Sequence, residues 1–129
     1  MTMNDVAHVN TFIQDGALEA LRGPQDAVAA MVHEDDRCRK MVCERLNQMS
    51  GVTCEMPEGT IYAFPDISAT GRSSQDIADI LLEKAHVVVE AGTFYGPAGE
   101  GRLRVCFGAE PYERIEEGLE RMAKVLATL

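Results

Sequence analysis

Two arginines stand one residue apart in the stretch "RLRVCF" near the C-terminal end of the chain. Side chains alternate along a strand, so Arg102 and Arg104 would share one face while Leu103, Val105 and Phe107 enter the core from the other. A guanidinium on a rigid strand offers a planar set of N–H donors that matches a carboxylate. Two like charges also repel unless water or an anion separates them. The spacing offers a carboxylate site, and a pair of solvated surface arginines is the alternative.

A glycine-rich loop, "GTFYGPAGEG", leads directly into this strand. A phosphate-binding loop of the P-loop type needs a lysine and a Ser or Thr after its last glycine, and neither follows here. The loop also leads into a strand, so no helix N-terminus would receive an anion. We therefore expect no nucleotide site, and glycines that only turn the chain remain an alternative to a role beside the arginines.

Metal binding is not expected from the four cysteines, none of which forms a CxxC pair. His33, Cys38 and Cys43 fall five residues apart on an expected helix. Five residues turn about 140° around a helix axis, so these three side chains diverge. Ordinary reduced thiols are the simpler reading of all four cysteines.

Composition narrows the class of protein. The chain has 129 residues, a net charge of -9 and 46% hydrophobic residues, which suits one acidic globular domain. The charge argues against nucleic-acid binding. The apolar runs fall short of the roughly 18 residues of a membrane span, and the first ten residues do not resemble a secretory leader. We expect a cytoplasmic protein without a membrane or nucleic-acid partner.

The pattern of apolar residues and breakers predicts eight elements in the order helix, helix, strand, strand, helix, strand, strand, helix. Gly23 and Pro24 separate the first two helices, and the Ser73–Asp76 spacing indicates an N-terminal cap on the third. The expected helices are 9–22, 24–49, 73–85 and 111–129, and the expected strands are 52–56, 61–67, 86–90 and 102–107.

This order predicts an α+β fold, with a small mixed or antiparallel sheet and helices packed mainly on one face. The second helix would have about 25 residues and a length of about 37 Å, which is more than a small domain needs. A helix of that length often braces two bodies.

Several separate motifs resemble one known family. "PEGTIYAFPDIS", then "SSQDIADILLEKAHVVVEAGTFYGPAGEGRLRVCFG", then a closing amphipathic helix resemble the C-terminal small domain of fold-type I pyridoxal-phosphate aminotransferases, in the aspartate aminotransferase-like class I/II group. The resemblance runs from about Val9 to the end. It implies one domain, 1–129, in which residues 1–24 are the remnant of an interdomain segment and 25–129 form the small domain.

The resemblance also assigns site residues. Arg104 matches the arginine that grips the α-carboxylate of the amino-acid substrate, and Arg102 falls where the family varies. Phe94 and Tyr95 stand where the family has an aromatic residue before a glycine, at the wall of the cleft or under it. Tyr62 follows the P-x-G turn near the substrate side, although a half-buried strand aromatic is the simpler reading of it.

The sequence departs from the family in two ways. Ala91, preceded by Glu90, replaces an expected proline at the entry to the loop. The family's Schiff-base lysine belongs to an upstream large domain, whereas Lys40, Lys84 and Lys124 stand on helices that we expect to be wholly or mostly exposed. The resemblance thus implies no catalytic, cofactor-binding or metal residue on this chain.

What the resemblance implies is the last third of an enzyme that uses pyridoxal phosphate, an amino acid and a 2-oxo acid. The chain alone would be inactive and would hold the cofactor weakly or not at all. Its partners would be the missing large domain and further copies in a homo-oligomer. Two other interpretations stay open: a stand-alone α+β module that binds a small acid or has a regulatory role, and a self-associating fragment without a ligand.

Overall fold

The computed structural model describes residues 9–108 and 110–129. The chain divides into two compact units, Met1–Val32 and His33–Leu129, which are described separately below. The expected interdomain segment 1–24 begins outside the described residues. Most of the first ten residues, from which we predicted that the chain has no secretory leader, also lie outside them. None of the described helices has the length and apolar character needed to cross a bilayer.

The first unit contains α1 (Thr11–Arg22) and the first residues of α2 (Asp26–Leu46). α1 ends where the Gly23 N–H bonds to the Glu19 carbonyl, and Pro24 follows. All twelve residues of α1 are described, and none of them is buried. Phe12 and Leu21 are 72% and 82% exposed. The helical stripe that the sequence predicts is present, but within this unit its apolar side chains lack a covering layer.

In the second unit α2 contributes one buried stripe to the core: Cys38, Met41, Val42, Cys43 and Leu46. The spacing of three and four residues places these side chains on one face. Asn47 then fixes the end of the helix: its amide nitrogen donates to the carbonyls of Cys43 and Cys54, and its amide oxygen accepts from the Cys54 N–H. The expected helix 24–49 is present with shorter ends.

The sheet consists of β1 (Tyr62–Ala63), β2 (Glu90–Ala91) and β3 (Leu103–Cys106) in the antiparallel order β1-β3-β2. β3 is the central strand and carries the alternation that the sequence predicts. Leu103 and Val105 are buried, as is Phe107 just beyond the strand. The register pairs Ala63 with Val105 and Ala91 with Leu103, so small residues lie beside large ones on the core face.

Three of the four expected strands are wrong or much shortened, and of the expected strand 61–67 only Tyr62–Ala63 forms β1. The segment 52–56 meets its neighbour only through the Thr53–Asp66 bridge, and the N–H and carbonyl of Cys54 bond to the Asn47 side chain. The segment 86–90 contributes only Glu90 to the sheet. His86 has φ 54 and the Val87 N–H bonds back to the Leu81 carbonyl, so these residues close the preceding helix instead.

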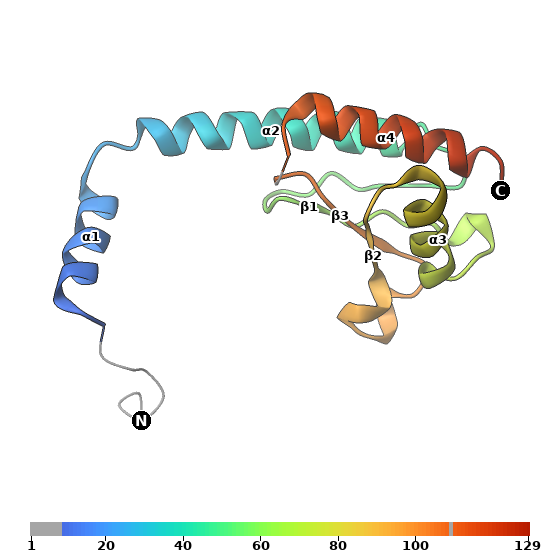
Figure 1. Ribbon diagram of the computed structural model, residues 1–129, viewed down its shortest axis with the longest axis horizontal. Coiled ribbons are helices and arrows are strands. Elements are labelled where there is room, and N and C mark those ends of the chain that lie inside the picture. The colour runs from blue at the N-terminus through green and yellow to red at the C-terminus, as the bar shows by residue number, and fades with distance from the viewer. Residues whose placement is uncertain (1–8, 109) are drawn as a thin grey trace. The chain divides into compact units, whose positions relative to one another are not determined.

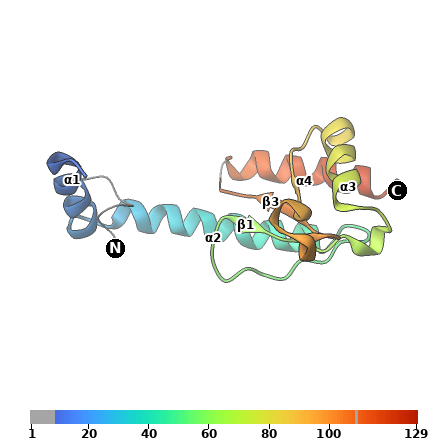
Figure 2. The ribbon, with the colours of Figure 1, turned by 90° about the horizontal axis from the view of Figure 1, so that it is seen from below.

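The remaining helices are α3 (Ser74–Ile80), continued by the π-helical turn η3 (Leu81–Ala85), and α4 (Tyr112–Leu126). The Ser73 side chain accepts from the Asp76 N–H, which confirms the predicted cap. Figures 1 and 2 show α3, α4 and the later part of α2 gathered around the small sheet. The buried side chains of these helices join those of the sheet in one core. The predicted α+β fold, with a small antiparallel sheet and helices packed mainly on one face, is confirmed.

Candidate functional site

The face of the sheet that the core leaves free carries polar and aromatic side chains. Glu90 lies directly opposite Arg104 in the β2–β3 register, and Tyr62 lies opposite Cys106 in the β1–β3 register. Because every second residue of a strand shares a face, these four side chains project from the same side. The strand ladder therefore places an acid and a tyrosine beside Arg104.

Arg104 is the centre of this group. Its Nη2 lies 2.7 Å from Oε1 of Glu90, and its guanidinium carbon lies 4.5 Å from the centre of the Tyr62 ring. The ring of Tyr95, from the glycine-rich loop, lies 5.0 Å away. These are cation–π distances. The side chain is 28% exposed, so the charge is held in place but remains open to a ligand.

A hollow of about 490 Å³ opens beside Arg104. It collects Arg102, Arg104, Tyr62 and Tyr95, which are four of the five site residues that the sequence predicts. The fifth, Phe94, is 69% exposed and does not line the hollow. The rest of the lining comes from the segment before β1 and from the residue that follows it: Glu55, Met56, Pro57, Thr60 and Phe64.

The charges of both arginines are balanced within the chain. Nη2 of Arg102 lies 3.4 Å from Asp66 Oδ2, just as Arg104 pairs with Glu90. The Ser68 hydroxyl and backbone N–H donate to Asp66 and, together with the Arg102 charge, lower the pKa of that carboxyl. The like-charge repulsion expected from the sequence is thus relieved by carboxylates on neighbouring segments.

Tyr95 completes the hydrogen-bonded group. Its hydroxyl donates to Oε2 of Glu90, and this hydrogen bond is the main reason that the pKa of the phenol is raised. Its ring meets Phe64 edge to face, with the centroids 6.3 Å apart. The glycine-rich loop therefore delivers one aromatic side chain, Tyr95, to the site.

The glycines of that loop have a packing role that the sequence left open. The loop forms two short 3₁₀ turns, η4 (Gly92–Tyr95) and η5 (Pro97–Gly99). A Cβ on Gly99 would lie 2.0 Å from the Gly92 carbonyl oxygen, and one on Gly92 would lie 2.2 Å from that of Gly99. The two turns touch backbone to backbone, which only glycine permits.

Ser74 ties the loop to the helix layer. This fully buried residue donates from its hydroxyl to the Gly99 carbonyl and accepts from the Arg102 N–H. Its own N–H donates to the Glu100 carboxylate. A buried hydroxyl with partners on both sides fixes the point at which the loop enters β3. Beyond the predicted helix start, nothing in the sequence indicates this contact.

Thr60, on the rim of the hollow, has a strained backbone. Its φ of 68° lies in the left-handed region, which β-branched residues avoid. Such strain persists only where the surrounding structure over-determines it, and it is common at binding sites.

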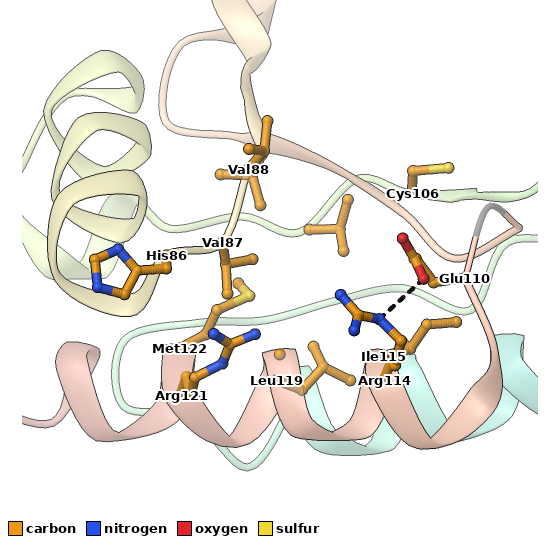
Figure 3. A pocket seen from close by; sticks show the side chains of 13 residues that line it. His86, Val87, Val88, Cys106, Glu110, Arg114, Ile115, Leu119, Arg121 and Met122 are labelled. Carbon is orange, nitrogen blue, oxygen red and sulfur yellow. Dashed lines mark ion pairs between the residues drawn. The ribbon is translucent and has the colours of Figure 1, made fainter.

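A second hollow, of about 350 Å³, lies between α4, β3 and the segment 86–89 (Figure 3). Its two arginines, Arg114 and Arg121, both come from α4, and Arg114 pairs with Glu110 at 3.0 Å. No site residue predicted from the sequence lines it. The hollow beside Arg104 is the stronger candidate because it gathers predicted residues from three segments.

Neither a metal centre nor a lysine accompanies the hollow. Among the described residues, no group of three His, Cys, Asp or Glu side chains could hold a metal ion. Lys40, Lys84 and Lys124 are all exposed on helical segments, and none lines the hollow. The chemistry that this arrangement supports is recognition of an anion by a guanidinium.

The comparisons with known proteins agree with the fold and define the class. The family model for aminotransferase class I and II matches residues 2–122, so the chain belongs to that family. It is 44% identical over 118 residues to an aspartate aminotransferase of Pyrococcus abyssi and 43% identical to aromatic-amino-acid aminotransferase 2 of Thermococcus litoralis. Each match covers 90% of this chain and 30% of the relative.

The solved structures give the same picture. The crystal structure of an aromatic aminotransferase from Pyrococcus horikoshii OT3 superposes with a TM-score of 0.86 at 42% identity, over 92% of this chain and 32% of that one. The chain therefore spans about a third of the length of the proteins that it matches.

Proposed function

We propose that this chain is the part of an aminotransferase that recognises the α-carboxylate of an amino acid or 2-oxo acid, with Arg104 as the recognising group. The observation that carries the proposal is the position of Arg104, which projects from the central strand into the hollow between two tyrosine rings. The family membership supports a carboxylate, rather than a phosphate, as the ligand.

The physical case rests on preorganisation. A charge-assisted hydrogen bond between a guanidinium and a carboxylate contributes about 1.5–3 kcal/mol. Arg104 loses little freedom on binding, because the strand and the two tyrosine rings already hold it. Arg102, Tyr62 and Tyr95 line the same hollow and would contact the rest of the ligand.

The cofactor belongs to another part of the enzyme in this proposal. Enzymes of this family depend on pyridoxal phosphate, which supplies the electron sink for exchange of the amino group. The described residues do not fit that group, because none of the three lysines lines the hollow. We expect the chain alone to be inactive and to bind the cofactor weakly or not at all. An imine absorbance that borohydride traps at Lys40, Lys84 or Lys124 would contradict this.

The remaining partners follow from the exposed surface. The proposed partners are the cofactor-binding large domain and further copies of the chain in a homo-oligomer, in the cytoplasm. The exposed apolar side chains of α1, including Phe12 and Leu21, favour association with some partner. Sedimentation of the chain at increasing concentration tests self-association, and a strictly monomeric profile would count against it.

Calorimetric titration with L-aspartate and 2-oxoglutarate tests the carboxylate site. We compare the native chain with Arg104→Lys and with Arg72→Lys, which makes the same change at an exposed arginine that does not line the hollow. We expect millimolar binding. Arg104→Lys should weaken it about tenfold, which corresponds to about 1.4 kcal/mol, because lysine cannot make the paired contact of a guanidinium with a carboxylate. Equal affinities in all three chains would refute the site. Micromolar binding that only Arg104→Lys abolishes would favour a stand-alone acid-binding module.

A further inference from the structure

Glu90 is built into the sheet as the counter-ion of Arg104. The two residues are direct partners in the β2–β3 ladder, so the backbone itself sets their distance. Both oxygens of the Glu90 carboxylate are engaged, one with Nη2 of Arg104 and the other with the hydroxyl of Tyr95. A pair fixed at three points differs from an ordinary surface ion pair between two free side chains.

Which nitrogen of Arg104 bonds to Glu90 decides how a ligand carboxylate can bind to the same guanidinium. A guanidinium has two edges that can hold a carboxylate with two parallel hydrogen bonds, and Nη2 belongs to both edges. Glu90 contacts Arg104 through this shared nitrogen. An incoming carboxylate can therefore gain a full two-bond contact on one edge only, or on either edge after Glu90 has moved away.

Charge adds to this effect. With Glu90 in place, the pair is neutral, and so is the neighbouring pair of Arg102 and Asp66. A ligand carboxylate thus enters a hollow whose positive charges are already matched, and it is repelled by Glu90 across the guanidinium. The sequence pattern alone, with two unopposed arginines, would suggest a strongly anion-binding surface.

We propose that Glu90 is an internal competitor for the substrate carboxylate at Arg104, and that it sets how tightly this site holds its ligand. The inference rests on the proposed function, because it assumes that Arg104 is the carboxylate-binding group. Glu90 acts through Arg104 and is not itself a catalytic residue. On binding, the ligand carboxylate takes over the hydrogen bond from Nη2, while Tyr95 retains its hydrogen bond to the displaced Glu90.

The test uses acetate, the simplest carboxylate probe, and the full 129-residue chain. Binding is followed by NMR on the arginine Nε–Hε signals, with Arg104 assigned from an Arg104→Lys spectrum. Glu90→Gln removes the charge at nearly constant shape, and Glu90→Asp keeps the charge. Glu83→Gln makes the same charge change at an exposed position in η3. A normal set of amide signals confirms that each variant is folded.

We expect Glu90→Gln to bind acetate about tenfold more tightly than the native chain, which corresponds to about 1.4 kcal/mol. Glu90→Asp and Glu83→Gln should stay within about threefold of native, well under that difference. The phenol of Tyr95 should also titrate at lower pH in Glu90→Gln, because the hydrogen bond to a carboxylate that raises its pKa is gone. A purely structural role for Glu90 would not produce this combination.

The outcomes separate the inference from the function beneath it. If acetate shifts the Arg104 signal equally in the native chain and in Glu90→Gln, Arg104 binds carboxylates and the competitor role is refuted. Weaker binding in Glu90→Gln would also refute it, and would show that Glu90 orients Arg104 for its ligand. If acetate moves the Arg104 signal in neither chain, the proposed function fails and the inference fails with it.

Discussion

Replacing Gly99 with alanine tests the packing that places the glycine-rich loop beside Arg104. The added Cβ would lie 2.0 Å from the Gly92 carbonyl oxygen, about 1.4 Å short of an ordinary contact of 3.4 Å. The Cβ is fixed rigidly to the backbone and the oxygen is part of it, so the two turns must separate. Overpacking of this kind costs about 1–3 kcal/mol. Separation also strains the hydrogen bonds that the Gly99 carbonyl accepts from Arg102 and Ser74, each worth about 1 kcal/mol.

We therefore expect Gly99→Ala to lower the free energy of unfolding by about 3 kcal/mol. Gly59→Ala is the matched control, because no described atom outside its chain neighbours would lie within 4 Å of the new Cβ. It should be neutral or should stabilise by about 0.4–1 kcal/mol through the unfolded chain. Urea unfolding followed by far-ultraviolet circular dichroism measures both. Equal midpoints at equal slopes would refute the contact between the two turns.

Three further predictions concern the core and the thiols. Phe107→Ala should cost about 3–5 kcal/mol because the ring is 1% exposed, whereas Val88→Ala, on an exposed side chain, should change stability by under about 0.5 kcal/mol; similar urea midpoints would contradict this. A thiol reagent should modify Cys106 rapidly in the folded chain and the three buried cysteines only after unfolding. Mass spectrometry measures the labelling, and rapid labelling of a buried cysteine in the folded chain would contradict the prediction. Burial raises the pKa of the Cys54 thiol to about 12 from an ordinary value of 9.0. The unfolded thiol thus loses its proton first, so stability should fall from about pH 9 towards pH 12, and less so in Cys54→Ala; an unchanged urea midpoint between about pH 8 and pH 10 would contradict this.

Much of the fold follows from patterns that are local in the sequence. The helices have apolar residues three and four apart and recognisable ends, such as Gly23 and the Ser73 cap. The strand that carries Arg104 alternates strictly between buried and open residues. Local patterns failed where hydrogen bonding is decided by neighbours. The segment 52–56 has strand-like composition, but it forms only one bridge, and the backbone of Cys54 bonds to the Asn47 side chain instead.

The site could be predicted from the sequence only where its residues lie in local patterns. Arg104 could be found because its strand and its family motif are local. Glu90 could not, because its position opposite Arg104 depends on the register across an eleven-residue connection. The loop geometry likewise decides that Tyr95, and not Phe94, lines the hollow. The sequence did mark this position in one way: Glu90 directly precedes Ala91, which stands where the family has a proline.

The most direct test of the central claim is a crystal structure of the chain soaked with L-aspartate at saturating concentration. We predict density for the α-carboxylate within about 3 Å of the Arg104 guanidinium, at the distance of a charge-assisted hydrogen bond. Density for the amino acid elsewhere on the chain, with the Arg104–Glu90 pair undisturbed and nothing bound to the guanidinium, would contradict the account.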